Sequence, residues 1–307
     1  MLTARAGSSA LPVLALTLNA LVWGTAWWPF RRLESFGLHP LWATALVFGV
    51  SALVIVCWRP RSLAQLLRTP SLWVLVLASG TTNAAFNWAV VIGDVVRVVL
   101  LFYLMPLWSV LLARLLLEEP LTRGAALRVA LALGGALVVL WPQGAAAGAG
   151  LLPDALAPSR STLLPDALGL IGGFSFALNN VMLRRESHRP EEARALAMFV
   201  GGVGVAGGLA TLLALQSQLA WPPAPQASWV GVATALAALF LAGNMALQYG
   251  AARLPANVTS VVMLTEVVFA SVSAWVLGAG AASPQLLLGG ALIVAAALHA
   301  AWRPAAG

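Results

Sequence analysis

Long runs of hydrophobic residues fill most of this chain, and short stretches containing arginine, proline or glycine separate them. A helix crosses the hydrocarbon core of a bilayer, about 30 Å thick, with roughly 20 apolar residues. The pattern predicts ten such helices, over residues 11–30, 38–58, 71–91, 95–117, 124–141, 166–184, 194–215, 227–249, 255–278 and 284–302. Helices are expected because the runs are continuously apolar, whereas strands of a membrane barrel alternate and are about half as long.

The composition supports a membrane protein. Of 307 residues, 61% are hydrophobic and 9% are charged, against about 25% charged in a typical soluble domain. We therefore expect an all-α integral membrane protein. The first run is too long for the apolar region of a signal peptide, so it is expected to be retained as a helix.

The net charge of +7 comes from arginine alone, and its distribution predicts the orientation of the chain. If the amino terminus is cytoplasmic, the inner side holds Arg5, Arg59, Arg61, Arg68, Arg114, Arg123, Arg128, Arg184, Arg185, Arg189, Arg194, Arg253 and Arg303. The outer side holds Arg31, Arg32, Arg97 and Arg160. Under the positive-inside rule, both termini are therefore expected to face the cytoplasm. A nucleic-acid patch needs basic residues gathered on one folded face, so no nucleic-acid partner is expected.

The two halves of the sequence resemble each other. NAAFNW at 83–88 and NMALQY at 244–249 align at a shift of 161 residues, which sets two amides and an aromatic residue against their counterparts. At a shift of 155 residues, LALGGALVVL at 131–140 matches LLLGGALIVA at 286–295 at seven of ten positions. The chain therefore reads as two repeats of five helices each.

The repeats are predicted to occupy residues 1–145 and 166–307, with an extracytoplasmic linker over 146–165. LLPDAL occurs twice around this linker, and we interpret it as a local duplication without a chemical role. Because five is an odd number, the second repeat enters the bilayer from the opposite side. Such inverted repeats place a shared site near the midplane and support alternating access, as is typical of transporters.

Three segments carry a resemblance to a known family. They are NALVWGTAWWPFR at 19–31, LMPLWSVLLARLLLEEPLT at 104–122, and LTEVVFASVSAWVLGAGAASP at 264–284, where Val267 replaces the usual proline. The chain resembles the drug/metabolite transporter superfamily in its ten-helix EamA-type branch, over essentially its whole length. Within that superfamily it is most similar to YddG-type exporters of aromatic amino acids.

The resemblance implies the EamA fold, in which two inverted five-helix repeats surround a central cavity. Helices one, three, four, six, eight and nine are expected to line that cavity. The implied function is export of aromatic and other small zwitterionic amino acids, or related metabolites, across a bacterial-type inner (plasma) membrane. The alternative is a multidrug exporter of lipophilic cations.

Polar side chains inside the predicted spans are candidates for substrate binding, because polar groups in lipid are costly unless they face a partner or water. Residues four apart share one face of a helix, as the paired amides of both repeats do. The predicted substrate-binding residues are Trp23, Trp27, Asn83, Asn87, Tyr103, Asn179, Asn180, Asn244, Gln248 and Glu266. The amides also have a structural interpretation, because Asn and Gln join membrane helices through hydrogen bonds averaging about 0.6 kcal/mol.

Glu266 is the only acid in the interior of a predicted span, where a charge costs about 2.5–3.5 kcal/mol on insertion scales. Three interpretations are open. The carboxyl is protonated and hydrogen-bonded across the helix interface, or it pairs with the ammonium group of an amino acid. Alternatively, it exchanges protons with a coupling gradient.

Other residues of the spans have predicted roles. Trp23 and Trp27 lie deeper than the tryptophans at span ends, so they are candidates for an aromatic or cation–π wall, with core packing as the alternative. Pro29 and Pro106 are predicted to break helices one and four and to take part in gating. Arg97 either attracts a carboxylate or reaches the lipid headgroups. The glycines expected to permit close packing of the seventh helix are Gly201, Gly202, Gly204, Gly207 and Gly208.

No metal, cofactor or enzymatic activity is expected. Cys57 is the single cysteine, and His39, His188 and His299 lie far apart without metal-binding spacing. The expected partners are a small-molecule substrate and the lipid bilayer. Proton-coupled and facilitated transport, and any oligomeric state, are compatible with the sequence.

Overall fold

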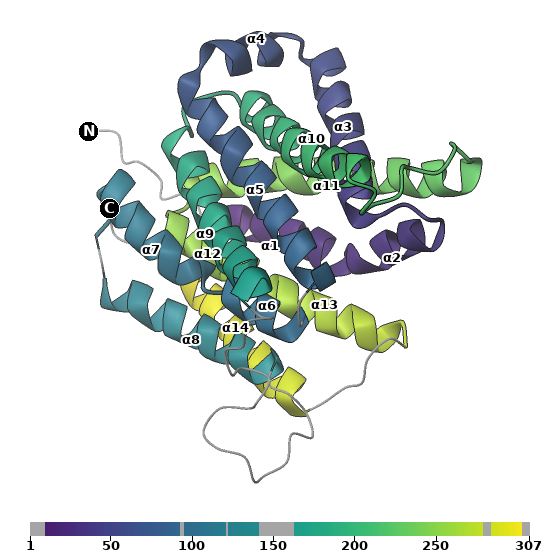
Figure 1. The fold of residues 1–307 in the computed structure, drawn as a ribbon. Helices are drawn as coiled ribbons and strands as arrows, with labels where there is room; N and C mark the ends of the chain where they lie inside the picture. The colour runs from purple at the N-terminus through teal and green to yellow at the C-terminus, as the bar shows by residue number, and fades with distance from the viewer. Residues whose placement is uncertain (1–9, 93–94, 121, 141–162, 279–283, 303–307) are drawn as a thin grey trace.

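The computed structural model describes residues 10–92, 95–120, 122–140, 163–278 and 284–302, and its regular elements are all α-helices (Figure 1). From the first half of the chain they are α1 (Ala10–Thr25), α2 (Trp27–Ser35), α3 (Pro40–Trp58), α4 (Arg61–Arg68), α5 (Pro70–Ile92), α6 (Val95–Phe102), α7 (Met105–Leu116) and α8 (Arg123–Leu140). From the second half they are α9 (Leu163–Arg185), α10 (Glu191–Leu215), α11 (Ala227–Arg253), α12 (Ala256–Met263), α13 (Thr265–Val276) and α14 (Pro284–Trp302). The predicted all-helical class is confirmed for these residues.

Two of the predicted spans break next to a proline. The span 11–30 divides into α1 and α2 at Ala26, three residues before Pro29, and the span 95–117 divides into α6 and α7 before Pro106. A proline lacks the N–H that would bond the carbonyl four residues earlier, and its ring clashes with that carbonyl. The predicted helix-breaking effect of both prolines is therefore seen, and their role in gating stays a prediction.

A third break, in the span 255–278, was not predicted, because Val267 stands where the first half has a proline. Here α12 ends at Met263 and α13 begins at Thr265. The Thr265 hydroxyl donates to the carbonyl oxygen of Val262 at 2.7 Å, which satisfies a backbone acceptor at the end of α12. Glu266 consequently lies in the first turn of α13 rather than in the middle of a continuous helix. The partial positive charge of a helix amino terminus favours a carboxylate there.

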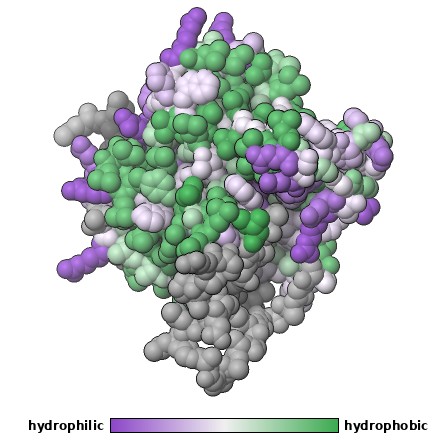
Figure 2. Space-filling view, in the orientation of Figure 1, coloured by the Kyte–Doolittle hydropathy of each residue, from purple (hydrophilic) through white to green (hydrophobic). Residues whose placement is uncertain are grey.

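The outer surface is suited to lipid. Figure 2 shows hydrophobic residues over much of the visible face, with hydrophilic side chains projecting mainly at its edges. Large apolar side chains are strongly exposed, among them Leu115 at 75% and Leu287 at 73%. Within the described residues, six helical segments are long and apolar enough to cross a membrane, or seven if the bent pair Arg61–Arg68 and Pro70–Ala89 is one span. The chain is a multi-pass membrane protein, and the count of ten spans stays a prediction.

Helices from the two halves of the chain pack against one another throughout the interior. α5 packs between α9 and α10, α8 packs along α14, and α1 contacts both α11 and α13. A carbon atom added at Gly80 would lie 2.4 Å from the Gly201 carbonyl oxygen, and one at Gly201 would lie 2.1 Å from the Val76 carbonyl oxygen. The backbones of α5 and α10 therefore meet directly, because these two residues are glycines.

The other glycines of α10 differ from one another. Gly202 lies against the ring of Phe48, and Gly207 lies near Ala45, whereas Gly204 and Gly208 face open space. The predicted packing role thus holds for part of this set.

The junction between the halves is shorter than predicted where it is described. α9 begins at Leu163, so the last three residues of the predicted linker 146–165 are helical. The first LLPDAL copy and the rest of that linker lie outside the described residues.

Candidate functional site

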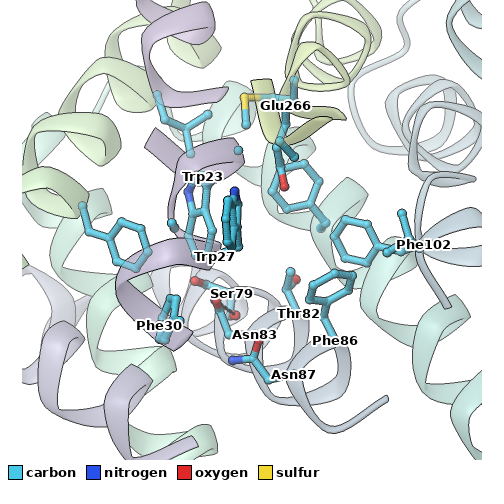
Figure 3. Close-up of a pocket in the computed structure, with 18 of the residues that line it drawn as sticks. Trp23, Trp27, Phe30, Ser79, Thr82, Asn83, Phe86, Asn87, Phe102 and Glu266 are labelled. Carbon is cyan, nitrogen blue, oxygen red and sulfur yellow. Dashed lines mark hydrogen bonds between the residues drawn. The ribbon is translucent and has the colours of Figure 1, made fainter. Parts of the chain in front are cut away.

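A cavity of about 570 Å³ lies in the interior, where helices of both halves meet (Figure 3). α1, α2, α5, α6, α9, α11, α12 and α13 contribute to its wall, together with Pro40 and Phe48 of α3 and Met198 and Phe199 of α10. All three helix breaks border it, since Ala26, Tyr103 and Met263 are wall residues. The expected lining helices are therefore present, and the second and seventh predicted helices are additional contributors.

Ten aromatic residues of the described chain line the wall, and contacts with one another and with neighbouring side chains hold their rings in place. Trp23 stacks on Phe240 with ring centroids 4.5 Å apart, and Phe86 lies 4.8 Å from Phe102. The Trp27 indole N–H donates to the Ser273 hydroxyl of α13 at 2.9 Å. Figure 3 shows Trp23 and Trp27 beside each other, with Phe86 and Phe102 on the far side of the open space. Trp23 and Trp27 thus line the cavity, and their role in substrate binding stays a prediction.

One face of α5 supplies more polar residues to the cavity wall than any other described helix. Ser79, Thr82, Asn83, Phe86 and Asn87 all line it, at the spacing of three and four residues that puts side chains on one helix face. The two amides differ in their contacts. Asn83 donates to the Ser79 carbonyl oxygen of its own helix at 2.9 Å, whereas Asn87 donates to the Thr44 hydroxyl of α3 at 3.0 Å. Asn87 therefore also joins two helices.

Two further amides come from the second half. Asn244 lines the cavity and donates a long contact of 3.4 Å to the Met198 sulfur. Asn179 is a wall residue that is only 1% exposed, and neither its amide nitrogen nor its amide oxygen has a partner among the described residues. An unpaired buried amide is costly, so the Asn179 side chain is available to hydrogen-bond a molecule in the cavity.

Glu266 and Arg31 are the charged side chains of the described wall. The Glu266 side chain points into the open space in Figure 3, and no described residue donates a hydrogen bond to its carboxylate. Arg31 belongs to α2, and its Cζ atom lies 5.3 Å from the centroid of the Trp27 ring. The cavity thus carries one acid and one base on largely aromatic walls.

Two predicted binding residues lie outside the cavity wall. Asn180 donates to the Ser260 hydroxyl at 3.3 Å, and Gln248 donates to the Met198 sulfur at 3.1 Å and to the Asn244 amide oxygen at 3.2 Å. Both side chains are fully buried between helices. These contacts join neighbouring helices, as the structural interpretation of the amides describes. Tyr103 is a wall residue, while Pro29 and Pro106 are not.

A buried polar seam lies on one side of the cavity. Ser260 of α12 bonds Ser109 of α7 as well as Asn180 of α9, and Asn19 of α1 donates to the Met263 sulfur at 3.4 Å. Every residue of α12 is buried. The seam therefore joins α1, α7, α9 and α12 next to Met263, the residue of α12 that lines the cavity.

Arg31, Ser79 and Thr82 line the cavity but are not among the binding residues predicted from the sequence. Arg31 had been used only as an orientation signal, although its spacing of four residues from Trp27 placed both on one helix face. Arg97 is the other arginine considered as a partner for a substrate carboxylate, and its side chain lies outside the described residues. No group of three or more potential metal ligands occurs in the part of the chain that the structure describes.

Glu119 is a titratable group outside the spans with a structural role. Burial raises the pKa of its carboxyl above the ordinary value, although the backbone N–H of Ala256 and the Arg184 guanidinium oppose that rise. Ala256 is the first residue of α12. Glu119 therefore lies where the end of α7 meets the start of α12.

Comparisons with known proteins agree with this description. Residues 10–141, which form the first half of the chain, match the EamA-like transporter family. A solved structure described as "Crystal structure of protein" is similar over 96% of this chain and 97% of its own, with a TM-score of 0.74 and 21% identity. That likeness concerns the fold. A search among curated proteins finds no match.

Proposed function

We propose that this chain, with its EamA-like transporter domain, exports aromatic and other small zwitterionic amino acids or related metabolites. One observation carries the proposal: a 570 Å³ cavity with aromatic walls contains the Glu266 carboxylate without a donor among the described residues. An ammonium group would supply that donor. A charge-assisted hydrogen bond of this kind contributes about 1.5–3 kcal/mol.

The proposed mechanism is alternating access by two inverted repeats of five helices, with both termini in the cytoplasm of a cell with a bacterial-type inner membrane. In that orientation, Arg31, Asn87 and Ala274 belong to the outer parts of their helices, so the cavity would face outward. The α12 seam, with its Ser109–Ser260 contact, would then be the inner barrier. Export requires this barrier to open while the outer side closes, and the helix breaks at Ala26, Tyr103 and Leu264 supply sites for such bending.

The amides and rings have distinct tasks in this proposal. Asn83, Asn179 and Asn244 offer donors and acceptors to the polar part of a substrate, while Trp23 and Trp27 contact its side chain. Asn87 would contact the substrate and also joins α5 to α3, because its amide donates to the Thr44 hydroxyl. Proton exchange at Glu266 is a separate property, which a pH gradient tests in the same assay.

Export of lipophilic cations is the second candidate, and the same wall favours it. Aromatic faces attract cations, and Glu266 would pair with a quaternary ammonium group as well as with a primary one. The two functions predict different compounds that compete with the transported substrate. Free amino acids should compete in the first case and quaternary ammonium dyes in the second.

The test is counterflow in proteoliposomes. Vesicles preloaded with single unlabelled amino acids take up a labelled aromatic amino acid, with and without a pH gradient. The wild type is compared with Glu266→Gln and with Glu34→Gln, which removes an exposed acid of α2 outside the cavity wall. Preloading should accelerate uptake in the wild type and in Glu34→Gln, and Glu266→Gln should lose selectivity or pH response.

The opposite results are equally informative. If inserted, folded protein gives no counterflow with any amino acid, the amino-acid assignment is rejected. If quaternary ammonium dyes drive counterflow instead, the second candidate replaces the first. If Glu266→Gln behaves as Glu34→Gln does, Glu266 has only a structural role.

A further inference from the structure

Arg31 lies in the wall between two cavities. It lines the central cavity and also a neighbouring cavity of about 310 Å³, whose other wall residues are Trp27, Trp28, Arg32, Ser35 and Leu277. Trp27 is the other residue that both cavities share. Arg31 therefore stands where the central cavity leads to the surface, and its side chain is exposed there.

The guanidinium of Arg31 is free to bind an anion. No carboxylate of the described residues lies within salt-bridge distance of it, although Glu34 belongs to the same short helix. The cation rests over the Trp27 ring, a contact that leaves the N–H groups at its edge available. The adjacent Arg32 differs, because its Cζ lies 5.0 Å from the Phe36 ring, away from the central cavity.

Arg31 and Glu266 lie at different heights of the same cavity. A carbon atom added at Gly24 would lie 2.7 Å from the Glu266 carbonyl oxygen, so α1 touches the start of α13 at this point. Arg31 follows seven residues later, beyond the break at Ala26 and on α2. Its cation lies over the Trp27 ring, which belongs to the first residue of α2 next to that break.

We propose that Arg31 is the residue that recognises the substrate carboxylate, so that an amino acid binds with its ammonium group toward Glu266 and its carboxylate toward Arg31. This inference rests on the proposed function and specifies the substrate class of that same site. A cavity wall that carries both Glu266 and Arg31 favours a zwitterion over a simple amine, because only the zwitterion offers a carboxylate to the Arg31 guanidinium. Guanidinium groups suit this task, since their planar N–H fork matches a carboxylate.

The experiment measures binding of three related compounds to the purified full chain by calorimetry. Tryptophan has both charges, tryptophanamide keeps the ammonium group alone, and indole-3-propionate keeps the carboxylate alone. The variants are Arg31→Gln, Arg31→Lys and Glu266→Gln. Arg32→Gln is the matched control, because Arg32 adjoins Arg31 but does not line the central cavity.

Wild type should bind tryptophan about tenfold or more tightly than tryptophanamide, the ratio expected from one charge-assisted contact. Arg31→Gln should remove this preference by weakening tryptophan binding alone, and Arg31→Lys should restore part of it. Arg32→Gln should keep the wild-type ratio. Glu266→Gln should instead remove the preference for tryptophan over indole-3-propionate.

Several results would overturn the inference. Equal losses for tryptophan and tryptophanamide in Arg31→Gln would indicate a structural role, and equal effects of Arg31→Gln and Arg32→Gln would indicate a general surface charge. An unchanged preference in Arg31→Gln would reject the carboxylate contact while the proposed function stands. If wild type binds none of the three compounds while remaining folded, the proposed function itself fails.

Discussion

The contact between α5 and α10 allows a sharp test of the fold through Gly201→Ala. A carbon atom at Gly201 would lie 2.1 Å from the Val76 carbonyl oxygen and 3.0 Å from the Gly80 nitrogen, while ordinary contact begins at 3.4 Å. Both neighbours are backbone atoms, so no side-chain rotation can relieve the overlap, and the two helices must separate by about 1 Å. Overpacking of this kind costs about 1–3 kcal/mol and occasionally more.

Gly204→Ala is the matched variant on the same helix, since nothing lies within 4 Å of a carbon atom added there. Replacing glycine by alanine in a helix contributes up to about 1 kcal/mol of stability. That gain applies to both variants, so Gly201→Ala should be up to about 2 kcal/mol less stable than wild type and Gly204→Ala slightly more stable. The difference between the two equals the overpacking cost, about 1–3 kcal/mol, because the gain cancels.

The assay is reversible unfolding of the purified chain in mixed micelles with increasing dodecyl sulfate, followed by tryptophan fluorescence. Gly201→Ala should shift the unfolding midpoint to lower detergent fraction, and Gly204→Ala should not. Equal midpoints for the two variants would refute the direct backbone contact between α5 and α10. A destabilised Gly204→Ala with an unaffected Gly201→Ala would show that the packed surface of α10 lies at Gly204 instead of Gly201.

Further predictions concern buried polar groups. Asn179→Leu should leave the free energy of unfolding unchanged or raise it, because both amide atoms of Asn179 lack a partner among the described residues. Asn87→Leu should instead lower the free energy of unfolding by about 1 kcal/mol, because it loses the contact with Thr44. Both should reduce counterflow, and a large loss of stability in Asn179→Leu would contradict the first expectation. The pKa of Glu119 is raised by burial, so the native chain binds protons more tightly than the unfolded chain, and stability is lost as the pH rises from about 4.5 through the raised pKa. The melting temperature of Glu119→Gln relative to wild type should therefore increase with pH over that range. Glu118→Gln, which changes an exposed acid, should show no such trend. A difference between Glu119→Gln and wild type that stays constant with pH would refute the raised pKa of Glu119.

Much of the fold follows from the sequence for simple physical reasons. Backbone groups in lipid must be paired internally, so a continuously apolar run is a helix. Pro29 and Pro106 reveal two breaks, because a missing N–H is visible in the sequence. The break before Thr265 is not visible, because Val267 occupies the position that Pro106 has in the first half.

The candidate site was predictable to the extent that helical spacing determines which side chains share a face. Asn83 and Asn87 share a face of α5, and both line the cavity. The same spacing relates Asn244 to Gln248, yet only Asn244 lines the cavity, because Met198 of α10 covers the Gln248 amide. Which neighbour covers a side chain depends on packing between distant segments.

The glycines illustrate the same limit of local pattern. Gly201 and Gly204 are equivalent in sequence context, but one meets the backbone of α5 and the other faces open space. Arg31 was assigned to orientation alone because a basic residue at a span end satisfies the positive-inside pattern wherever its side chain lies.

The most direct test of the account is counterflow of labelled tryptophan into proteoliposomes preloaded with unlabelled tryptophan, with wild type compared with Glu266→Gln and Glu34→Gln. The account predicts strong stimulation by preloading in wild type and Glu34→Gln, and altered selectivity or pH response in Glu266→Gln. Absence of stimulation in wild type that is folded and inserted, or unchanged transport in Glu266→Gln, would contradict the claim that this cavity binds amino acids through Glu266.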